Sequence, residues 1–80
     1  MSETIKLKYP VTADGVEINE ITIRRPKVSD TLASNKVKGS ELDQEVRLIA
    51  NLSELSPNTI ESLDLFDYKR IADKLVGFFS

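Results

Sequence analysis

Residues 56–80, SPNTIESLDLFDYKRIADKLVGFFS, hold the longest run of apolar residues at helical spacing in the chain. Asp64 stands at the expected start of a helix, where its side-chain oxygen can accept hydrogen bonds from the free backbone N–H groups of the first turn. Asp67 adds negative charge to that turn, which suits the helix dipole. An apolar stripe follows at helical spacing: Tyr68, Ile71, Ala72, Leu75 and Phe79. Three apolar residues fall outside this stripe: Phe66, Val76 and Phe78. We expect one side of this aromatic helix to form the core and the other to contact a partner.

The length of 80 residues allows one small domain, residues 1–80, whose folding removes roughly 60% of its unfolded surface from water. Hydrophobic residues make up 40% of the chain and charged residues 30%, which is typical of a soluble folded domain. There is no cysteine, which excludes disulfides, thiolate metal sites and thiol nucleophiles. No apolar stretch near the start has the pattern of a signal peptide or membrane span, so we expect no membrane partner.

An antiparallel hairpin is expected over residues 3–25. Apolar and polar residues alternate over residues 4–9, and Asp14-Gly15 is a strong signal for a two-residue turn. That turn would place Val11 opposite Ile18 and Tyr9 opposite Glu20. Beyond this point Ile21 and Ile23 would face the wrong side. We therefore predict one extra residue near Asn19-Glu20, in the second strand, with a longer irregular turn as the alternative. The bulge would bring eight residues to one face: Ile5, Leu7, Tyr9, Val11, Val16, Ile18, Ile21 and Ile23.

Three to four helices are expected over residues 28–80, which makes the fold class α+β. A short, polar and weakly held helix over residues 31–36 would be capped by Ser29 or Asp30, with a mobile linker as the alternative. Ser40 with Asp43 resembles a capping box at the start of a helix over residues 41–55. Ser56-Pro57 then indicates a third, short helix to about residue 62. The helix over 41–55 carries one broad apolar face: Leu42, Val46, Leu48, Ile49, Ala50, Leu52 and Leu55.

No set of residues indicates catalysis, a cofactor or a metal. The chain has no histidine, which is the commonest general base and metal ligand. Helix capping explains Asp64 and Asp67 better than a catalytic carboxylate pair, which would need environments that split their pKa values. The acidic residues 41, 43 and 45 suit the dipole of a helix start. We therefore expect no enzyme activity.

The basic residues at positions 24, 25, 27, 36 and 38 are interpreted as a solvated face, with an anion-binding site as the alternative. No aromatic residue is interleaved with them to stack on bases. Residues 1–40 carry seven Lys/Arg and five Asp/Glu, whereas residues 41–80 carry four and eight. A mildly basic first half and an acidic second half of the chain do not match a dedicated nucleic-acid-binding domain, which is usually strongly basic.

Four stretches in this order carry a family resemblance: the hairpin with DGVE at 14–17, ITIRRPKVSD at 21–30, ELD at 41–43 with LIANL at 48–52, and LSPNTIESLDLFDYKRIADKL at 55–75. Together they resemble the short tail assembly chaperones of long-tailed bacteriophages, of the Mu-like contractile-tail kind. That family has Arg-x-Pro and Asp after a strand, and Leu-x-Pro before Leu-Asp-x-x-Asp-Tyr. Residues 31–38 depart from it by being more polar than the family's helix.

The resemblance implies a non-enzymatic factor that binds the tape measure protein before the tail tube polymerises around it. It implies a place in the cytoplasm of the bacterial host and absence from the mature virion. It also implies a longer form of the same protein, made by translational frameshifting, as a further partner.

We expect the partner-binding surface, or a contact between copies in a homo-oligomer, to include six residues: Leu48, Leu52, Leu55, Phe66, Phe78 and Phe79. A client made of long amphipathic helices would need many weak apolar contacts of this kind. Two alternatives remain at this stage: a minor structural or connector protein of the phage tail, and a small nucleic-acid-binding regulator.

Overall fold

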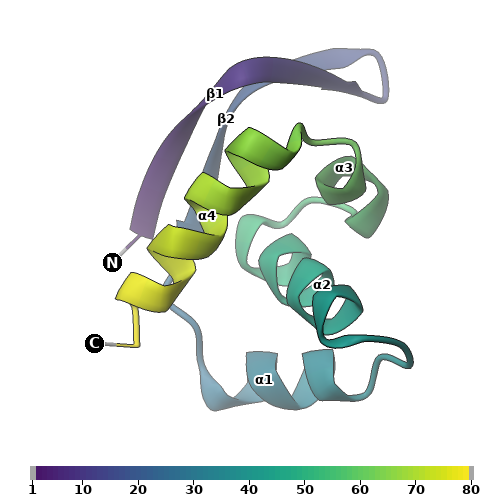
Figure 1. Cartoon of the computed structure of the whole chain (residues 1–80), viewed down its shortest axis with the longest axis vertical. Coiled ribbons are helices and arrows are strands. Elements are labelled where there is room, and N and C mark those ends of the chain that lie inside the picture. Colours follow the sequence, from purple (N-terminus) through teal and green to yellow (C-terminus); the bar gives the residue numbers. More distant parts are fainter. Residues whose placement is uncertain (1, 80) are drawn as a thin grey trace.

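A hairpin and four helices make up residues 2–79, the part of the chain that the computed structural model describes (Figure 1). Met1 and Ser80, the ends of the expected 1–80 domain, lie outside the described residues. The elements in order are β1 (Ser2–Ala13), β2 (Val16–Arg24), α1 (Val28–Asn35), α2 (Glu41–Ser53), α3 (Pro57–Glu61) and α4 (Leu65–Gly77). The α+β class, with an antiparallel hairpin before the helices, is therefore confirmed.

Different helices pack on the two strands of the hairpin. α4 packs on β1 and α2 packs on β2, while α1 lies against α2 at the far side from the hairpin (Figure 1). The core between these elements is built from thirteen buried residues: Ile5, Leu7, Ile21, Ile23, Ile49, Ala50, Leu52, Ile60, Leu63, Tyr68, Ile71, Leu75 and Phe78.

The hairpin turns at Asp14-Gly15, as expected. The φ angles of these two residues are 51° and 77°, both positive. This is the backbone of a primed two-residue turn, whose twist matches that of the strands it connects. Glycine adopts such a φ without strain, and aspartate tolerates it better than most residues.

The two strands pair in two registers that are separated by an irregular stretch. Near the turn Val11 pairs with Ile18, whereas further along Lys6 pairs with Glu20. Residues 7–10 of β1 thus stand opposite the single Asn19 of β2. The irregularity lies at the predicted position along the hairpin, but the prediction of one extra residue in β2 is wrong. The three extra residues are in β1.

An odd number of extra residues switches the face of the strand, whichever strand carries them. Six of the eight residues assigned to one face therefore do pack on the core: Ile5, Leu7, Val11, Ile18, Ile21 and Ile23. The other two were placed wrongly. Tyr9 lies in the irregular stretch and is 47% exposed, and Val16 lies at the turn and is 63% exposed.

A buried carboxylate accepts hydrogen bonds from two backbone donors of the irregular stretch. Asp67 accepts the N–H of Lys8 at 3.0 Å and the N–H of Tyr9 at 2.9 Å. The next residue, Pro10, has no N–H to satisfy. Arg70 donates to the Lys6 carbonyl oxygen at 2.8 Å and to Asp67 Oδ1 at 3.0 Å. The extra residues in β1 therefore leave none of these N–H groups unpaired.

Asp67 keeps its charge although its side chain is wholly buried. Burial by itself would raise the pKa of Asp67. The two backbone N–H groups and the Arg70 guanidinium outweigh that effect and hold its pKa below the ordinary value. Asp67 lies in the first turn of α4, as expected, but its carboxylate binds β1 rather than capping the helix.

Side-chain oxygens start three of the four helices as predicted. Asp64 accepts from the N–H of Phe66 at 2.9 Å, and Ser56 accepts from that of Thr59 ahead of α3. Ser40 and Asp43 form the predicted capping box of α2. The prediction for α1 is wrong, because this helix begins at Val28 and has Lys27 as its N-cap.

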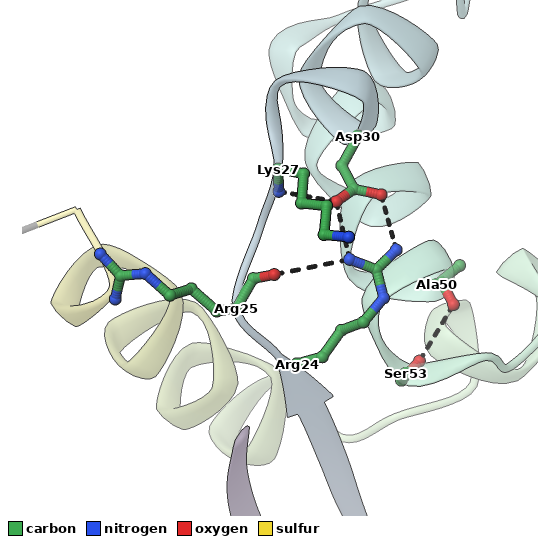
Figure 2. A network of polar contacts seen from close by, with 6 residues as sticks. All are labelled: Arg24, Arg25, Lys27, Asp30, Ala50 and Ser53. Carbon is green, nitrogen blue, oxygen red and sulfur yellow. Dashed lines mark hydrogen bonds and ion pairs between the residues drawn. The ribbon is translucent and has the colours of Figure 1, made fainter. Parts of the chain in front are cut away.

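The end of β2 is tied to the first turn of α1 (Figure 2). The Arg24 guanidinium donates two hydrogen bonds to the Asp30 carboxylate, at 2.8 and 2.7 Å, and the Lys27 N–H donates a third at 2.8 Å. The Arg24 hydrogen bond is the largest effect on Asp30 and, with the Lys27 N–H, it outweighs burial and lowers the pKa of Asp30 to about 2. The side chain of Arg25 points away from this pair in Figure 2.

The apolar stripe of α4 ends one residue earlier than predicted. Tyr68, Ile71 and Leu75 are buried, but Phe78 is 9% exposed and Phe79 is 65% exposed, the reverse of our assignment. Phe78 follows Leu75 by three residues, and this spacing suits a helical face as well as the four-residue spacing of Phe79. Only the position of the neighbouring elements decides between the two.

Replacing Asp67 with alanine should lower the free energy of unfolding by about 2–4 kcal/mol. The change leaves the part-buried N–H groups of Lys8 and Tyr9 without their acceptor and the Arg70 guanidinium without its partner. Urea denaturation followed by circular dichroism measures this loss. The matched control is Asp73→Ala on the same helix, where the carboxylate is exposed. Equal stabilities of the two variants would contradict the role given to Asp67.

The Arg24–Asp30 pair should make stability fall in acid. Because the pKa of Asp30 is about 2 in the folded chain and 3.8 ordinarily, its contribution is complete above about pH 4 and declines as the pH approaches 2. Asp30→Asn should therefore cost about 1–3 kcal/mol at pH 7 and progressively less below pH 4. Urea midpoints of both proteins between pH 7 and pH 2 test this. A difference that stays constant over the range would contradict it.

Candidate functional site

Exposed apolar side chains are the main feature of this protein's surface. Within residues 2–79 no three carboxylates converge as metal ligands would. None of the described helices has the length and apolarity needed to cross a membrane. Nine large apolar side chains are exposed instead: Tyr9, Val16, Val28, Leu32, Leu42, Leu65, Phe66, Val76 and Phe79. Single exposed apolar residues are common, so their grouping is what matters.

One group, Leu42 and Leu65, lines a groove between α2, α3 and the start of α4. Two adjoining depressions, of about 300 and 380 Å³, share Leu42, Val46 and Glu61 in their walls. Leu42 is 59% exposed and Leu65 is 64% exposed. We call this surface the helical groove. Eight of its twelve lining residues are apolar or aromatic: Val37, Leu42, Val46, Pro57, Ile60, Leu63, Leu65 and Tyr68. The other four are charged: Lys38, Asp43, Arg47 and Glu61.

A hydrogen bond from Tyr68, a residue of the groove wall, joins α4 to α2. The Tyr68 hydroxyl donates to Glu45 Oε1 at 2.5 Å. Burial, and then the Glu45 carboxylate, raise the pKa of Tyr68 well above its usual value, so this side chain stays a neutral donor.

A second group of exposed side chains joins aromatic rings and cations above Asp67. Tyr9 and Phe66 meet edge to face, with ring centroids 6.5 Å apart and planes at 86°. The Lys8 Nζ lies 5.5 Å from the Tyr9 centroid and 5.2 Å from that of Phe66, and Arg70 lies 5.7 Å from Phe66. Aromatic residues and arginine are the residue types most enriched where proteins bind each other.

The third group lies on α1, whose two faces are reversed relative to an ordinary surface helix. Its buried side chains are the polar Asp30 and Ser34. Its large apolar side chains, Val28 and Leu32, are 78% and 58% exposed. Each pair is separated by four residues, and the two pairs lie on opposite sides of the helix. The apolar side of α1 therefore faces outward.

The six residues predicted to bind a partner do not lie together. Leu52 and Phe78 are core residues, with 2% and 9% exposure, and so offer no surface. Leu48 and Leu55 are half-buried against the core. Phe66 belongs to the aromatic group, and Phe79 is exposed just after α4 ends.

Sequence reasoning missed Leu42 and Leu65 as surface residues. It assigned Leu42 to the apolar face of its helix and gave Leu65 no role. Both stand within two positions of an N-cap, Ser40 for Leu42 and Asp64 for Leu65. Helical spacing does not distinguish these two exposed positions from buried ones, so the sequence pattern offered no signal for them.

One comparison with known proteins connects this chain to a family. The model of a family described as phage tail assembly chaperone proteins, E, or 41 or 14, matches residues 4–80. No curated protein and no solved structure matches the chain significantly. The match covers almost the whole chain and confirms the resemblance seen in the sequence. The chain therefore belongs to the phage tail assembly chaperone family.

Proposed function

We propose that this protein is a non-enzymatic chaperone that binds the tape measure protein while the phage tail tube assembles. Membership of the family implies protein partners. The observation that supports this client best is the helical groove, where Leu42 and Leu65 are more than half exposed beside a core that is already complete without them. Such a groove suits the apolar side of an amphipathic helix, which inserts side chains at intervals of three and four residues.

The contact made by one copy would be weak, and this suits a protein that must later leave. Fully burying one leucine side chain is worth about 1.5–3 kcal/mol, before the cost of association is subtracted. Two exposed leucines therefore support only a low affinity. Many copies along one long client would bind tightly together and could be displaced one by one as the tube polymerises.

The proposal includes the cell compartment and the partners expected from the sequence. The protein would act in the cytoplasm of the bacterial host and be absent from the mature virion. A longer, frameshifted form of the same chain and contacts between copies would act with it.

Four of the six predicted residues keep a direct role in this proposal. Phe66 and Phe79 are exposed, and Leu48 and Leu55 are accessible at their edges. Leu52 and Phe78 would contribute by holding α2 and α4 in place, since both are packed inside.

Co-expression with the cognate tape measure protein tests the helical groove. The double variant Leu42→Ser, Leu65→Ser should retain at least tenfold less client in an affinity pull-down. Its free energy of unfolding should change by no more than about 0.5 kcal/mol per site, because both side chains are exposed. Val16→Ser, equally exposed at the hairpin turn, is the matched control. Undiminished binding by the double variant would remove the groove from the proposal.

Mass spectrometry of purified virions tests the assembly role itself. A chaperone that leaves should be detectable in lysates of infected cells and missing from finished particles. Finding it in virions at a fixed ratio to the tube protein would instead indicate a structural or connector protein.

A further inference from the structure

The fold closes one edge of the hairpin and leaves the other open. In an antiparallel pair each strand directs half of its N–H and C=O groups to its neighbour and the other half outward. β1 is interrupted by its extra residues, and α4 closes this stretch. Asp67 accepts two of its N–H groups, and Arg70 donates to the Lys6 carbonyl oxygen. A further strand therefore finds no regular ladder along β1.

The outer edge of β2 has no such cover. Within residues 2–79 no hydrogen bond joins the backbone of residues 17–23 to any element other than β1. A depression of about 530 Å³ lies beside this strand, lined by residues 17–22 together with Lys6, Ser53 and Leu55. No helix or loop of the described chain fills that space. The outward N–H and C=O groups of β2 are therefore available to a further strand.

The composition of β2 also favours pairing. Natural edge strands are often protected by lysine or proline, and β2 contains neither. Five of its nine residues are β-branched, which favours extended backbone: Val16, Ile18, Ile21, Thr22 and Ile23. The open edge is thus a good strand without the usual protection.

From this open edge we propose that β2 pairs antiparallel with β2 of a second copy of the chain. The product is a four-stranded sheet in the order β1-β2-β2-β1, with a twofold axis perpendicular to the sheet at Thr22. Both copies then keep their helices on the same face of the sheet. This pairing defines the contact between copies in the proposed function. Its role rests on that function, whereas the pairing itself needs no client.

The charge pattern of β2 is complementary to itself. Glu20, Thr22 and Arg24 are all exposed and alternate with buried isoleucines, so they share the outer face. An axis at Thr22 places Glu20 of each copy opposite Arg24 of the other. Lys6 already stands opposite Glu20 within one chain, so charges of opposite sign alternate across the four strands.

Arg24 can take part while it keeps its own partner. Its two terminal nitrogens bind Asp30. The Arg24 side chain is still 44% exposed, and its Nε–H makes no hydrogen bond within residues 2–79. A guanidinium carries five N–H donors, so Glu20 of the second copy can bind beside Asp30.

A second copy suits this edge better than the client. The helical client of the proposed function has its backbone groups bonded within the helix, so it has none to offer a strand. Pairing of residues 20–24 is a small contact beside the roughly 1,200 Å² that stable complexes bury. The dimer should therefore form at high concentration, as when many copies gather on one client.

Sedimentation of the chain alone, from about 10 μM to about 1 mM, tests the pairing. The average mass of the wild type should rise with concentration toward that of two chains. Thr22→Lys places two like charges opposite each other at the axis and should raise the dissociation constant at least tenfold. A wild type that stays monomeric, or a Thr22→Lys variant that associates equally well, would overturn the pairing.

Thr4→Lys is the matched control. Thr4 and Thr22 are both exposed and share one hydrogen bond of 2.9 Å, so either substitution removes the same contact and adds the same charge. Thr4 lies on β1, one strand away from the open edge. This variant should associate like the wild type.

Single cysteines test the register, because the chain has no cysteine of its own. Two Thr22→Cys chains should join in a disulfide under mild oxidation, since the axis brings their Cα atoms to about 4.5–5.5 Å. Glu17→Cys, which is exposed on the same strand but far from the axis, should react at least tenfold more slowly. Equal rates for the two variants would contradict the pairing.

These outcomes separate the pairing from the proposed function. If the copies pair through β2 but the wild type retains no tape measure protein, the proposed function fails and the pairing stands. If a chain that stays monomeric on its own retains the client, only the pairing is overturned. Protection of β2 amides from hydrogen exchange only when the client is present would assign the edge to a client strand and would also overturn it.

Discussion

The carboxylate of Asp67 is the contact on which the arrangement of this protein depends. It lies wholly buried between α4 and β1 and accepts the N–H groups of Lys8 and Tyr9. Without an acceptor there, the three extra residues in β1 would leave these two part-buried donors unpaired, at a cost of up to about 1–3 kcal/mol each. The same bonds position α4 on the hairpin. One side chain therefore satisfies the irregular strand and orients the helix that completes the core.

The core that results is small and rich in isoleucine, and it uses the apolar residues that the hairpin, α2, α3 and α4 can bring together. A second polar tie, Arg24 to Asp30, attaches α1 at the edge without burying its apolar side chains. An 80-residue chain has no second layer to cover what remains. The surplus apolar surface lies in the helical groove, around Phe66 and on α1, and these are the surfaces that a polypeptide partner can use.

Most of the elements could be predicted because their signals are local. The positive φ angles at Asp14-Gly15 and the capping oxygens of Ser40, Ser56 and Asp64 act within a few residues of the chain. The candidate site was predicted less well. Phe66 and Phe79 are exposed, but Leu52 and Phe78 are core residues, and the groove wall at Leu42 and Leu65 was missed. Exposure depends on which other element lies against a helix face, and helical spacing alone does not report that.

The sequence by itself determined the order of the elements, the tight turn and three of the four helix starts, because dihedral preferences and capping hydrogen bonds join residues close along the chain. The tertiary structure decided which strand carries the extra residues, that Asp67 accepts bonds from 58 and 59 positions away, and that α1 turns its apolar side outward. These outcomes follow from packing between distant segments. Burial and the pairing of backbone donors belong to the assembled molecule, not to any one stretch.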